Sequence, residues 1–455
     1  MPDTIAAIAT IQAPSAIGIV RLTGPDTRRI LDGVFAPANG RPMSAQTPRK
    51  LVFGRALDRS GGVIDEALAV LFPGPNSYTG EDCAEIHCHG SPVVLDEVLA
   101  AAFARGARQA RGGEFTQRAF LSGRMDLIQA ESVADLIDAE SAGAARNAVG
   151  QLQGRMSRSV GGIYDALMDV VSRFYAIVDY PDEEIEPLQQ AQIEQTLAES
   201  AERLDALLAT FSRGRLLKSG VPAVILGKPN AGKSSLLNAL LGYDRAIVTD
   251  IAGTTRDTVE EKVLVGSVLL RLCDTAGIRD AADTVERLGV ERAQQAAQRA
   301  ELALLVLDGS APLTREDEEA IAAARQARRM LVLVNKADLP QVLDTAALRV
   351  RFGEVIPLSA HSGAGVDALC RAVEELFAGG ETPRGELLTN ARQAESAQRA
   401  LDAVRRAEQA LRSGLSPDAV LTDAEEALEA LAEFSGKRVR DDLVATIFSR
   451  FCVGK

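Results

Sequence analysis

The chain has 455 residues, too many for one ordinary hydrophobic core, so we expect two to four domains. Its net charge of −13 argues against a broad basic surface that coats nucleic acid, and its five cysteines form no CxxC pair, as in reduced cytoplasmic proteins. The longest apolar runs are far shorter than a membrane span, and the first residues lack the basic region of a signal peptide, so we predict a cytoplasmic protein without a membrane segment.

The first part of the chain, residues 1–118, mixes short β-branched runs with glycine and proline. Runs at 17–22, 63–72 and 84–87 predict strands, because β-branched and apolar residues favour extended backbone. The glycines and prolines between these runs indicate turns. We therefore predict a small α+β domain at the N-terminus.

The rest of the chain divides into helical and mixed parts. Alanine-rich sequence with scattered Glu, Gln and Arg predicts helices over 119–217 and again over 381–455. Between them, residues 218–380 alternate apolar runs with helical segments, a pattern typical of a parallel sheet. The strands of this sheet are expected at 221–226, 269–273, 302–307, 331–334 and 355–357. The prediction is an α/β domain inserted in an all-α helical domain.

The inserted domain carries a phosphate-binding motif. The sequence GKPNAGKS at 227–234 fits the P-loop pattern GxxxxGK[ST], follows an apolar strand and precedes a helical segment. In such a loop, backbone N–H groups and a helix N-terminus face the phosphates, Lys233 reaches the β- and γ-phosphates, and the Ser234 hydroxyl ligates Mg²⁺. In this setting a chance match is remote.

A second motif selects the base. NKAD at 335–338 follows the strand at 331–334, and Ser359 and Ala360 lie on a later turn. The Asp338 carboxylate can accept hydrogen bonds from the N1–H and the 2-amino group of guanine, which adenine does not offer there. We therefore predict an α/β P-loop G domain that binds and hydrolyses GTP.

Two further segments of the G domain are expected to respond to the γ-phosphate. DTAG at 274–277 ends an apolar strand, and Asp274 is expected to hold the Mg²⁺ shell through water. In TDIAGTTRD at 249–257, Thr255 by its spacing completes the Mg²⁺ coordination. The predicted GTP-binding residues are Asn230, Ala231, Gly232, Lys233, Ser234, Ser235, Thr249, Asp250, Ile251, Ala252, Gly253, Thr254, Thr255, Asp274, Thr275, Ala276, Gly277, Asn335, Lys336, Ala337, Asp338, Ser359 and Ala360.

The residue after DTAG bears on hydrolysis. In Ras-like switches a glutamine there orients the attacking water, but this chain has Ile278, which cannot do so. Glu286 is a candidate for that role, acting through a bridging water. Spacing alone does not separate this role from that of a surface carboxylate.

The two ends of the chain carry a more specific resemblance. The chain closes with FCVGK at 451–455, and its N-terminal part contains FPGPNSYTGED at 72–82, EIHCHG at 85–90 and GEFTQRAFL at 113–121. DLIQAE at 126–131 and ADLID at 134–138 follow. Over essentially its whole length the chain resembles the tRNA-modification GTPases of the MnmE or TrmE family.

This resemblance implies an organisation and a cation. Residues 1–118 would form a tetrahydrofolate-binding and dimerisation domain, 119–217 and 381–455 the two parts of a helical domain, and 218–380 a Ras-like G domain. The family is a homodimer and a potassium-stimulated GTPase, in which K⁺ acts where an arginine finger would. The K⁺ ligands match Asn230, Thr249, Ile251 and Thr254, and the family's catalytic, water-positioning glutamate matches Glu286.

The resemblance also implies the modification chemistry. A reduced folate, 5-formyl- or 5,10-methylene-tetrahydrofolate, is expected at Arg21, Glu85, Arg124 and Lys455. An FAD-dependent partner, MnmG (GidA), would form a heterotetramer with the GTPase. Together they would add an aminomethyl or carboxymethylaminomethyl group to C5 of the wobble uridine of certain tRNAs.

Some alternatives remain open. A switch GTPase that binds ribosomes would carry the same G motifs, but it leaves the FCVGK end unexplained. Cys452 is either a catalytic thiol or an anchor of the tail. His87 and His89 alternate with Cys88 on a strand, which favours packing and hydrogen-bond roles over a metal cluster. One stretch of arginines is either a tRNA-phosphate contact or a solvated surface: Arg105, Arg108, Arg111, Arg118 and Arg124.

Overall fold

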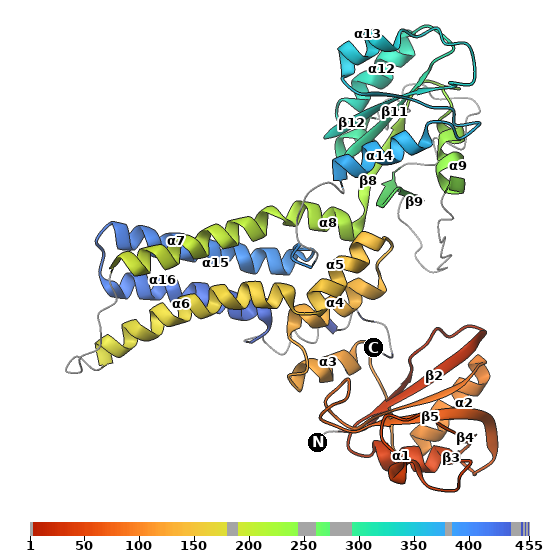
Figure 1. Cartoon of the computed structure of the whole chain (residues 1–455), viewed down its shortest axis with the longest axis vertical. Helices are drawn as coiled ribbons and strands as arrows, with labels where there is room; N and C mark the ends of the chain where they lie inside the picture. The colour runs from red at the N-terminus through yellow and green to blue at the C-terminus, as the bar shows by residue number, and fades with distance from the viewer. Residues whose placement is uncertain are drawn as a thin grey trace. The chain divides into compact units, whose positions relative to one another are not determined.

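The computed structural model describes residues 3–179, 190–243, 261–273, 294–377 and 385–437, together with residues 447–448, 451 and 454 (Figure 1). The chain forms two compact units. Unit 1 comprises residues 1–134, 151–204 and 395–455, and unit 2 comprises residues 135–150 and 205–394. An N-terminal α+β part, a helical part and an α/β part are all present, as predicted.

The N-terminal part of unit 1 is built on a seven-stranded sheet with the order β3-β4-β5-β6-β2-β1-β7. Its neighbouring strands are antiparallel except β1 and β7, which are parallel. The strands are β1 (Ile5–Ile8), β2 (Ser15–Thr23), β3 (Phe35–Pro37), β4 (Val52–Leu57), β5 (Val63–Phe72), β6 (Cys83–Gly90) and β7 (Arg108–Gln109), with helices α1 (Thr27–Val34) and α2 (Pro92–Ala104).

The two faces of this sheet differ because side chains alternate along each strand. On one face, Val20, Ile86 and their neighbours pack against Ile30 of α1 and Leu95 of α2 in a closed core. The other face carries the alternate residues, including Arg21, with a small cluster of buried residues at one end. Side chains on this second face, Arg21 among them, are therefore buried only where other segments of the chain cover them.

Helices make up the middle of the chain and most of its C-terminal part. They are α3 (Glu114–Leu121), α4 (Leu127–Ile137), α5 (Ala142–Leu152), α6 (Arg155–Asp179), α7 (Gln190–Ala209), α8 (Phe211–Ser219), α15 (Ala391–Arg412) and α16 (Pro417–Ser435). Within unit 1, α6 packs along α16, and Arg406 of α15 pairs with Asp423 and Glu426 of α16. Among the described residues, no helix is long and apolar enough to cross a membrane.

The α/β part of unit 2 is a six-stranded sheet with the order β13-β12-β11-β8-β10-β9. Its strands are β8 (Val221–Leu226), β9 (Glu261–Val265), β10 (Val268–Leu272), β11 (Leu302–Asp308), β12 (Arg329–Asn335) and β13 (Val355–Pro357). Five strands are parallel, whereas β9 is antiparallel to β10. The five strands expected from the sequence are those that are parallel, whereas β9 was not predicted, and two turn residues join it to β10 in a hairpin.

Helices cover both faces of this sheet, as its continuous apolar strands require. Helices α9 (Lys233–Tyr243) and α14 (Val366–Phe377) contribute to the core on one face. Helices α12 (Arg315–Ala324) and α13 (Thr345–Phe352) contribute to the core on the other. All seven residues of β11 are buried, so the sheet is a rigid base for the loops that follow its strands.

Candidate nucleotide-binding site

Four loops meet at one edge of the six-stranded sheet because β8, β11, β12 and β13 are parallel neighbours. The P-loop follows β8, and the segment 308–310 follows β11. NKAD begins at the end of β12, and Ser359 and Ala360 follow β13. Ligands of open α/β sheets bind at this carboxyl edge.

The P-loop has a backbone that only certain residues can adopt. Gly227 has a φ of 155°, and a Cβ there would lie 2.3 Å from the carbonyl oxygen of Val306. Gly232 has a φ of 99°, and a Cβ there would lie 2.1 Å from Nδ2 of Asn335. Asn230 is left-handed at a φ of 60°, an uncommon conformation for a residue with a side chain. This constrained loop leads directly into the N-terminus of α9.

The side chain of Lys233 folds back onto the first two residues of the P-loop. Its Nζ donates hydrogen bonds to the carbonyl oxygens of Gly227 and Lys228, both at 2.8 Å. Burial lowers the pKa of this ammonium group, because the charged form is less well solvated. Phosphate oxygens would offer it stronger, charged acceptors than these carbonyls.

Asn335 joins three of the four loops. Its side chain is buried; Nδ2 donates to the carbonyl oxygen of Ala231 at 2.8 Å, and Oδ1 accepts from the backbone N–H of Ala360 at 2.9 Å. The first residue of NKAD thus connects the P-loop to the segment after β13. It is a structural link between the phosphate and base regions.

Asp338 and Lys336 are each held by a neighbour. The Ser359 hydroxyl donates to Oδ1 of Asp338 at 2.5 Å, and this hydrogen bond lowers the pKa of the carboxyl group, so Asp338 is ionised at neutral pH. Lys336 has a φ of 64°, and its Nζ lies 2.6 Å from Oδ2 of Asp308. An exposed carboxylate in a fixed orientation is suited to reading the N–H groups of guanine.

The structure places the other predicted G-domain residues as follows. Ser234 and Ser235 begin α9, and Ala337 lies between the two held side chains of NKAD. The rest of the predicted set lies outside the described residues: Thr249, Asp250, Ile251, Ala252, Gly253, Thr254, Thr255, Asp274, Thr275, Ala276, Gly277 and Glu286.

A second polar site lies in unit 1, on the sheet face that α1 and α2 do not cover. Nη2 of Arg21 donates to Oε1 of Glu85 at 2.8 Å, and Nη1 donates to the carbonyl oxygen of Gly454 at 3.3 Å. The guanidinium carbon lies 5.7 Å from the ring centres of both Tyr78 and Phe115. Burial raises the pKa of Glu85, but the charge of Arg21 and its hydrogen bonds lower this pKa by more. The pKa therefore lies below its usual value, and the pair is ionic.

Comparison with known proteins identifies the family. Residues 4–124 match the model described as GTP-binding protein TrmE N-terminus, and residues 127–452 match the MnmE helical domain. The tRNA modification GTPase MnmE of Roseiflexus sp. (strain RS-1) is 45% identical, over 100% of this chain and 99% of its own. The chain belongs to the MnmE family. The predictions of a GTP hydrolase and of its fold class are thereby confirmed.

Other similar proteins were found. The tRNA modification GTPase MnmE of Symbiobacterium thermophilum is 42% identical, again over 100% of this chain and 99% of its own. Among solved structures, the G domain of the T. maritima FeoB iron transporter aligns with 35% of this chain and 99% of its own, at 22% identity and a TM-score of 0.27.

The predicted folate residues of this MnmE-family chain are only partly described. Arg21 and Glu85 are brought together, and Lys455 lies outside the described residues, as does Cys452. Arg124 is exposed, and its Cγ lies 3.4 Å from the position of a Cβ on Gly80, two residues after Tyr78. The structure therefore places Arg124 beside the segment 78–80, whose Tyr78 ring contacts Arg21.

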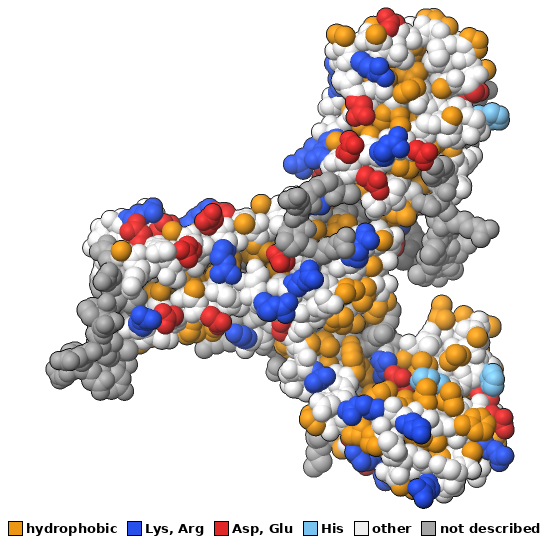
Figure 2. All heavy atoms as spheres, viewed as in Figure 1, with side chains coloured by type: hydrophobic (Ala, Val, Ile, Leu, Met, Phe, Trp, Pro, Cys, Tyr) orange, Lys and Arg blue, Asp and Glu red, His pale blue; other side chains and the backbone are white. Residues whose placement is uncertain are grey.

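The arginine-rich stretch is paired within the protein. Glu114 is buried and pairs with Arg108, Arg111 and Arg118, and Asp3 pairs with Arg108 and Arg118. Figure 2 shows Lys and Arg side chains interspersed with Asp and Glu over the helical part, whereas Lys and Arg predominate on the drawn face of the N-terminal part. These contacts favour a structural role for this stretch, apart from Arg124.

The His87–His89 segment lies on β6 and makes hydrogen bonds. His87 pairs with Glu85 at 3.1 Å and His89 with Asp65 at 2.8 Å, while Cys88 is buried in the core below α2. Burial raises the pKa of the Cys88 thiol to about 12, so it stays protonated at neutral pH. Among the described residues, no group of three or more His, Cys, Asp and Glu could hold a metal ion.

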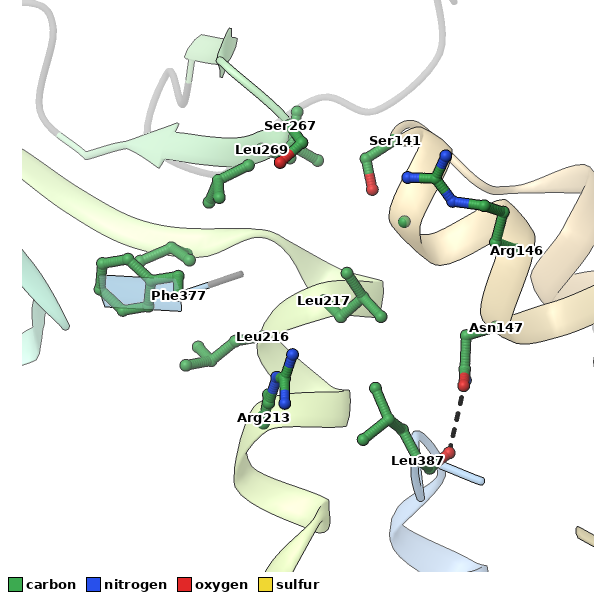
Figure 3. Close-up of a pocket in the computed structure, with 13 residues that line it drawn as sticks. Ser141, Arg146, Asn147, Arg213, Leu216, Leu217, Ser267, Leu269, Phe377 and Leu387 are labelled. Atoms are coloured by element: carbon green, nitrogen blue, oxygen red, sulfur yellow. Dashed lines mark hydrogen bonds between the residues drawn. The ribbon is translucent and has the colours of Figure 1, made fainter. Parts of the chain in front are cut away.

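Unit 2 also has a cavity of about 270 Å³ away from these loops (Figure 3). Its walls come from α5, α8 and the β9–β10 hairpin, and Asn147 of α5 donates to the carbonyl oxygen of Leu387 at 3.4 Å. The lining contains none of the predicted GTP-binding residues. It consists of Ser141, Gly143, Arg146, Asn147, Arg213, Leu216, Leu217, Val221, Ser267, Val268, Leu269, Phe377 and Leu387.

Three residues of these sites were missed by sequence reasoning. Asp308, which pairs with Lys336, ends an apolar strand, and that position at a carboxyl edge was a usable signal. Tyr78 and Phe115 lie inside the motifs that carried the family resemblance. Their contact with Arg21 joins segments far apart in the sequence, so no spacing rule would have found it.

Proposed function

We propose that the chain is a potassium-stimulated GTPase that acts, as a homodimer and with a flavin-dependent partner, on C5 of the wobble uridine of certain tRNAs. Tetrahydrofolate would supply the one-carbon unit of the added aminomethyl or carboxymethylaminomethyl group. Membership of the MnmE family supports the tRNA and GTP parts of this proposal. The observation that carries it is the convergence of P-loop, NKAD and Ser359-Ala360 through Asn335 and Asp338.

The nucleotide would lie along the carboxyl edge of the sheet. Its phosphate oxygens would replace the carbonyl oxygens of the loop as hydrogen-bond acceptors for Nζ of Lys233. They would also accept hydrogen bonds from the N–H groups at the start of α9. Asp338 would accept the N1–H and the 2-amino group of guanine. Because the Ser359 hydroxyl already orients this carboxylate, little of its freedom remains to be lost on binding.

Two cations fit the residues present. The Ser234 hydroxyl lies at the first turn of α9, where Mg²⁺ bound to phosphates would need an oxygen ligand, and Thr255 would add a second. Asn230 is exposed and left-handed in the loop, and its carboxamide oxygen is a suitable ligand for K⁺. Each cation would stabilise the charge that develops on the phosphates during hydrolysis.

Hydrolysis rates test the cation mechanism. The full-length chain is expected to hydrolyse GTP several-fold faster in KCl than in NaCl at matched ionic strength. Glu286→Ala is expected to lower turnover while leaving the Kd for GTP nearly unchanged, because a water-positioning group acts mainly in the transition state. Equal rates in the two salts would refute the role of potassium, and a loss of affinity in the variant would make Glu286 structural.

A folate fits the Arg21 site chemically. Carboxylates such as Glu85 can accept hydrogen bonds from the donor edge of a pterin, and the partly exposed ring of Tyr78 provides an apolar surface beside Arg21. Arg21, Arg124 and Lys455 would supply cations for the glutamate tail of the folate. Arg21, which pairs with Glu85 and donates to the carbonyl oxygen of Gly454, would hold the Glu85 carboxylate in place for the ligand.

Calorimetric titration with 5-formyltetrahydrofolate tests this site. Binding is expected for the unaltered chain, and Arg124→Ala should weaken it at least tenfold, as loss of one charged hydrogen bond implies. Arg59→Ala, at an exposed arginine elsewhere in the same sheet domain, is the matched control. A chain that binds GTP but no folate would favour the alternative, a switch GTPase without modification chemistry.

The homodimer is supported by an apolar patch on the same sheet face. Phe53, Leu68 and Ile17 are 53%, 37% and 60% exposed, and the strand register places Phe53 beside Leu68, which lies beside His87. Exposed apolar side chains that adjoin on one surface mark association sites. Phe53→Asp with Leu68→Asp is expected to give a monomer by light scattering, and an unchanged dimer would refute this interface.

A further inference from the structure

A buried ion pair joins the P-loop to helix α12. Nζ of Lys228, the second residue of the loop, lies 2.8 Å from Oδ2 of Asp317, and the two side chains are 11% and 1% exposed. Asp317 lies in the first turn of α12, where it also accepts hydrogen bonds from the backbone N–H and the hydroxyl of Thr314, both at 2.8 Å. None of the nucleotide-binding roles assigned above uses this pair.

The pair has an unusual balance of contacts. Oδ1 of Asp317 is buried and has no hydrogen-bond partner in the described part of the chain. Among the described residues, Lys228 is the only cationic side chain that forms an ion pair with the Asp317 carboxylate. A buried ion pair contributes little net stability compared with apolar residues of similar volume, whereas it does fix the geometry of the groups that it joins.

The ion pair fixes the geometry of the first two residues of the P-loop, Gly227 and Lys228, which we call the loop entrance. The backbone carbonyl of Lys228 accepts hydrogen bonds from Nζ of Lys233 at 2.8 Å and from the N–H of Ala231 at 3.3 Å. The preceding Gly227 is pressed against Val306 of β11. The loop entrance is thus held by its backbone on one side and by the Lys228 side chain on the other.

We propose that the Lys228–Asp317 ion pair is a positioning device that keeps the phosphate-binding loop in its nucleotide-binding conformation. This inference rests on the proposed nucleotide site. Without the pair, the loop entrance samples other conformations, and the apparent affinity falls with the fraction of chains that remain competent. The pair acts on substrate and transition state alike, so its loss raises KM and leaves kcat largely unchanged.

The experiment compares variants of the full-length chain by titration with a fluorescent methylanthraniloyl-GDP in Mg²⁺ and KCl. Lys228→Met is expected to raise the Kd about tenfold, which corresponds to ~1.4 kcal/mol. Lys228→Arg keeps the ion pair and is expected to restore binding to within about threefold of the unaltered chain. Arg315→Met, in the exposed Arg315–Glu319 pair on the same helix, is the matched control and should bind normally.

A double variant separates positioning from stability. Lys228→Met combined with Asp317→Asn leaves no unpaired buried charge, so we expect it to melt near the temperature of the unaltered chain and still to bind methylanthraniloyl-GDP about tenfold more weakly. Binding within about twofold of the unaltered chain would overturn the inference, because the pair would then serve stability alone. If the unaltered chain itself bound no guanine nucleotide, the proposed function would fail instead.

Discussion

Replacing Asn335 by alanine tests the link between the phosphate and base regions. This side chain is 2% exposed and makes two hydrogen bonds, one to the carbonyl oxygen of Ala231 and one from the N–H of Ala360. Both partner residues are buried, at 0% and 8% exposure. Asn335→Ala removes both bonds at once, and the shorter side chain leaves two buried backbone groups without partners.

The expected magnitude follows from these two groups. A buried donor or acceptor that loses its partner costs about 1–3 kcal/mol, so the variant should lose roughly 2–6 kcal/mol of the free energy of unfolding of unit 2. For a domain of this size, that corresponds to a drop in Tm of about 5–20 °C. Nucleotide affinity should fall as well, because the P-loop and the segment after β13 are no longer joined.

Differential scanning calorimetry of the full-length chain, with and without GDP, measures both effects. Asn238→Ala is the control, because Asn238 is an exposed residue of α9 close in sequence to the P-loop. We expect the control to melt and bind as the unaltered chain does. If Asn335→Ala left the transition of unit 2 and its shift with GDP unchanged, the link through this side chain would carry no energy.

Three more predictions concern single side chains. Gly232→Ala should abolish GDP binding, because the φ of 99° disfavours a Cβ that would lie 2.1 Å from Asn335. Asp338→Asn should weaken GDP binding at least ~100-fold and improve binding of xanthosine diphosphate. The NH₂ group of the asparagine would face the 2-amino donor of guanine, whereas it can donate to the 2-oxo group of xanthine. Burial raises the pKa of Glu114, but hydrogen bonds from Arg108 and the charges around it lower it to about 2, from 4.5 when unfolded. Its stabilisation is therefore present above about pH 4.5 and lost as pH falls toward 2, so Glu114→Gln should reduce stability at pH 7 by up to ~3 kcal/mol and make little difference at pH 2.

Each of these variants has a matched control. Gly242→Ala lies in open space on α9, and Asp344→Asn keeps a residue that caps α13 well, so both should bind GDP normally. Glu97→Gln changes an exposed carboxylate on α2 and should leave the pH dependence of urea unfolding unaltered. A Gly232→Ala chain that binds GDP, a GDP preference kept by Asp338→Asn, or equal pH profiles for Glu114→Gln and the unaltered chain would contradict the respective argument.

Much of the α/β fold was predictable because its strands are buried on both faces. The runs at 221–226 and 302–307 are continuous and apolar, and they form β8 and most of β11. Strand β9 was missed because it begins with two charged residues, Glu261 and Lys262, and lies at an edge. In the N-terminal sheet, β4 was missed because Gly54 and Arg55 interrupt its apolar pattern.

The candidate sites were predictable to the extent that topology fixes them. Parallel neighbouring strands bring their carboxyl ends to one edge, so the meeting of the P-loop with NKAD followed from the motifs and the fold class. The Lys228–Asp317 and Arg21–Gly454 contacts did not, because each joins residues that no local pattern relates. Such contacts depend on side-chain packing between distant segments, which sequence spacing does not encode.

The contact between Arg21 and Gly454 has a consequence for biosynthesis. These residues are 433 positions apart, and Gly454 also lies against the backbone of Ile8 in β1. During translation the N-terminal sheet leaves the ribosome long before its last covering segment exists. The nascent N-terminal part must therefore remain, with Arg21 uncovered, until residue 454 has been made. A premature stop codon before residue 454 would thus damage a site whose other residues are encoded far upstream.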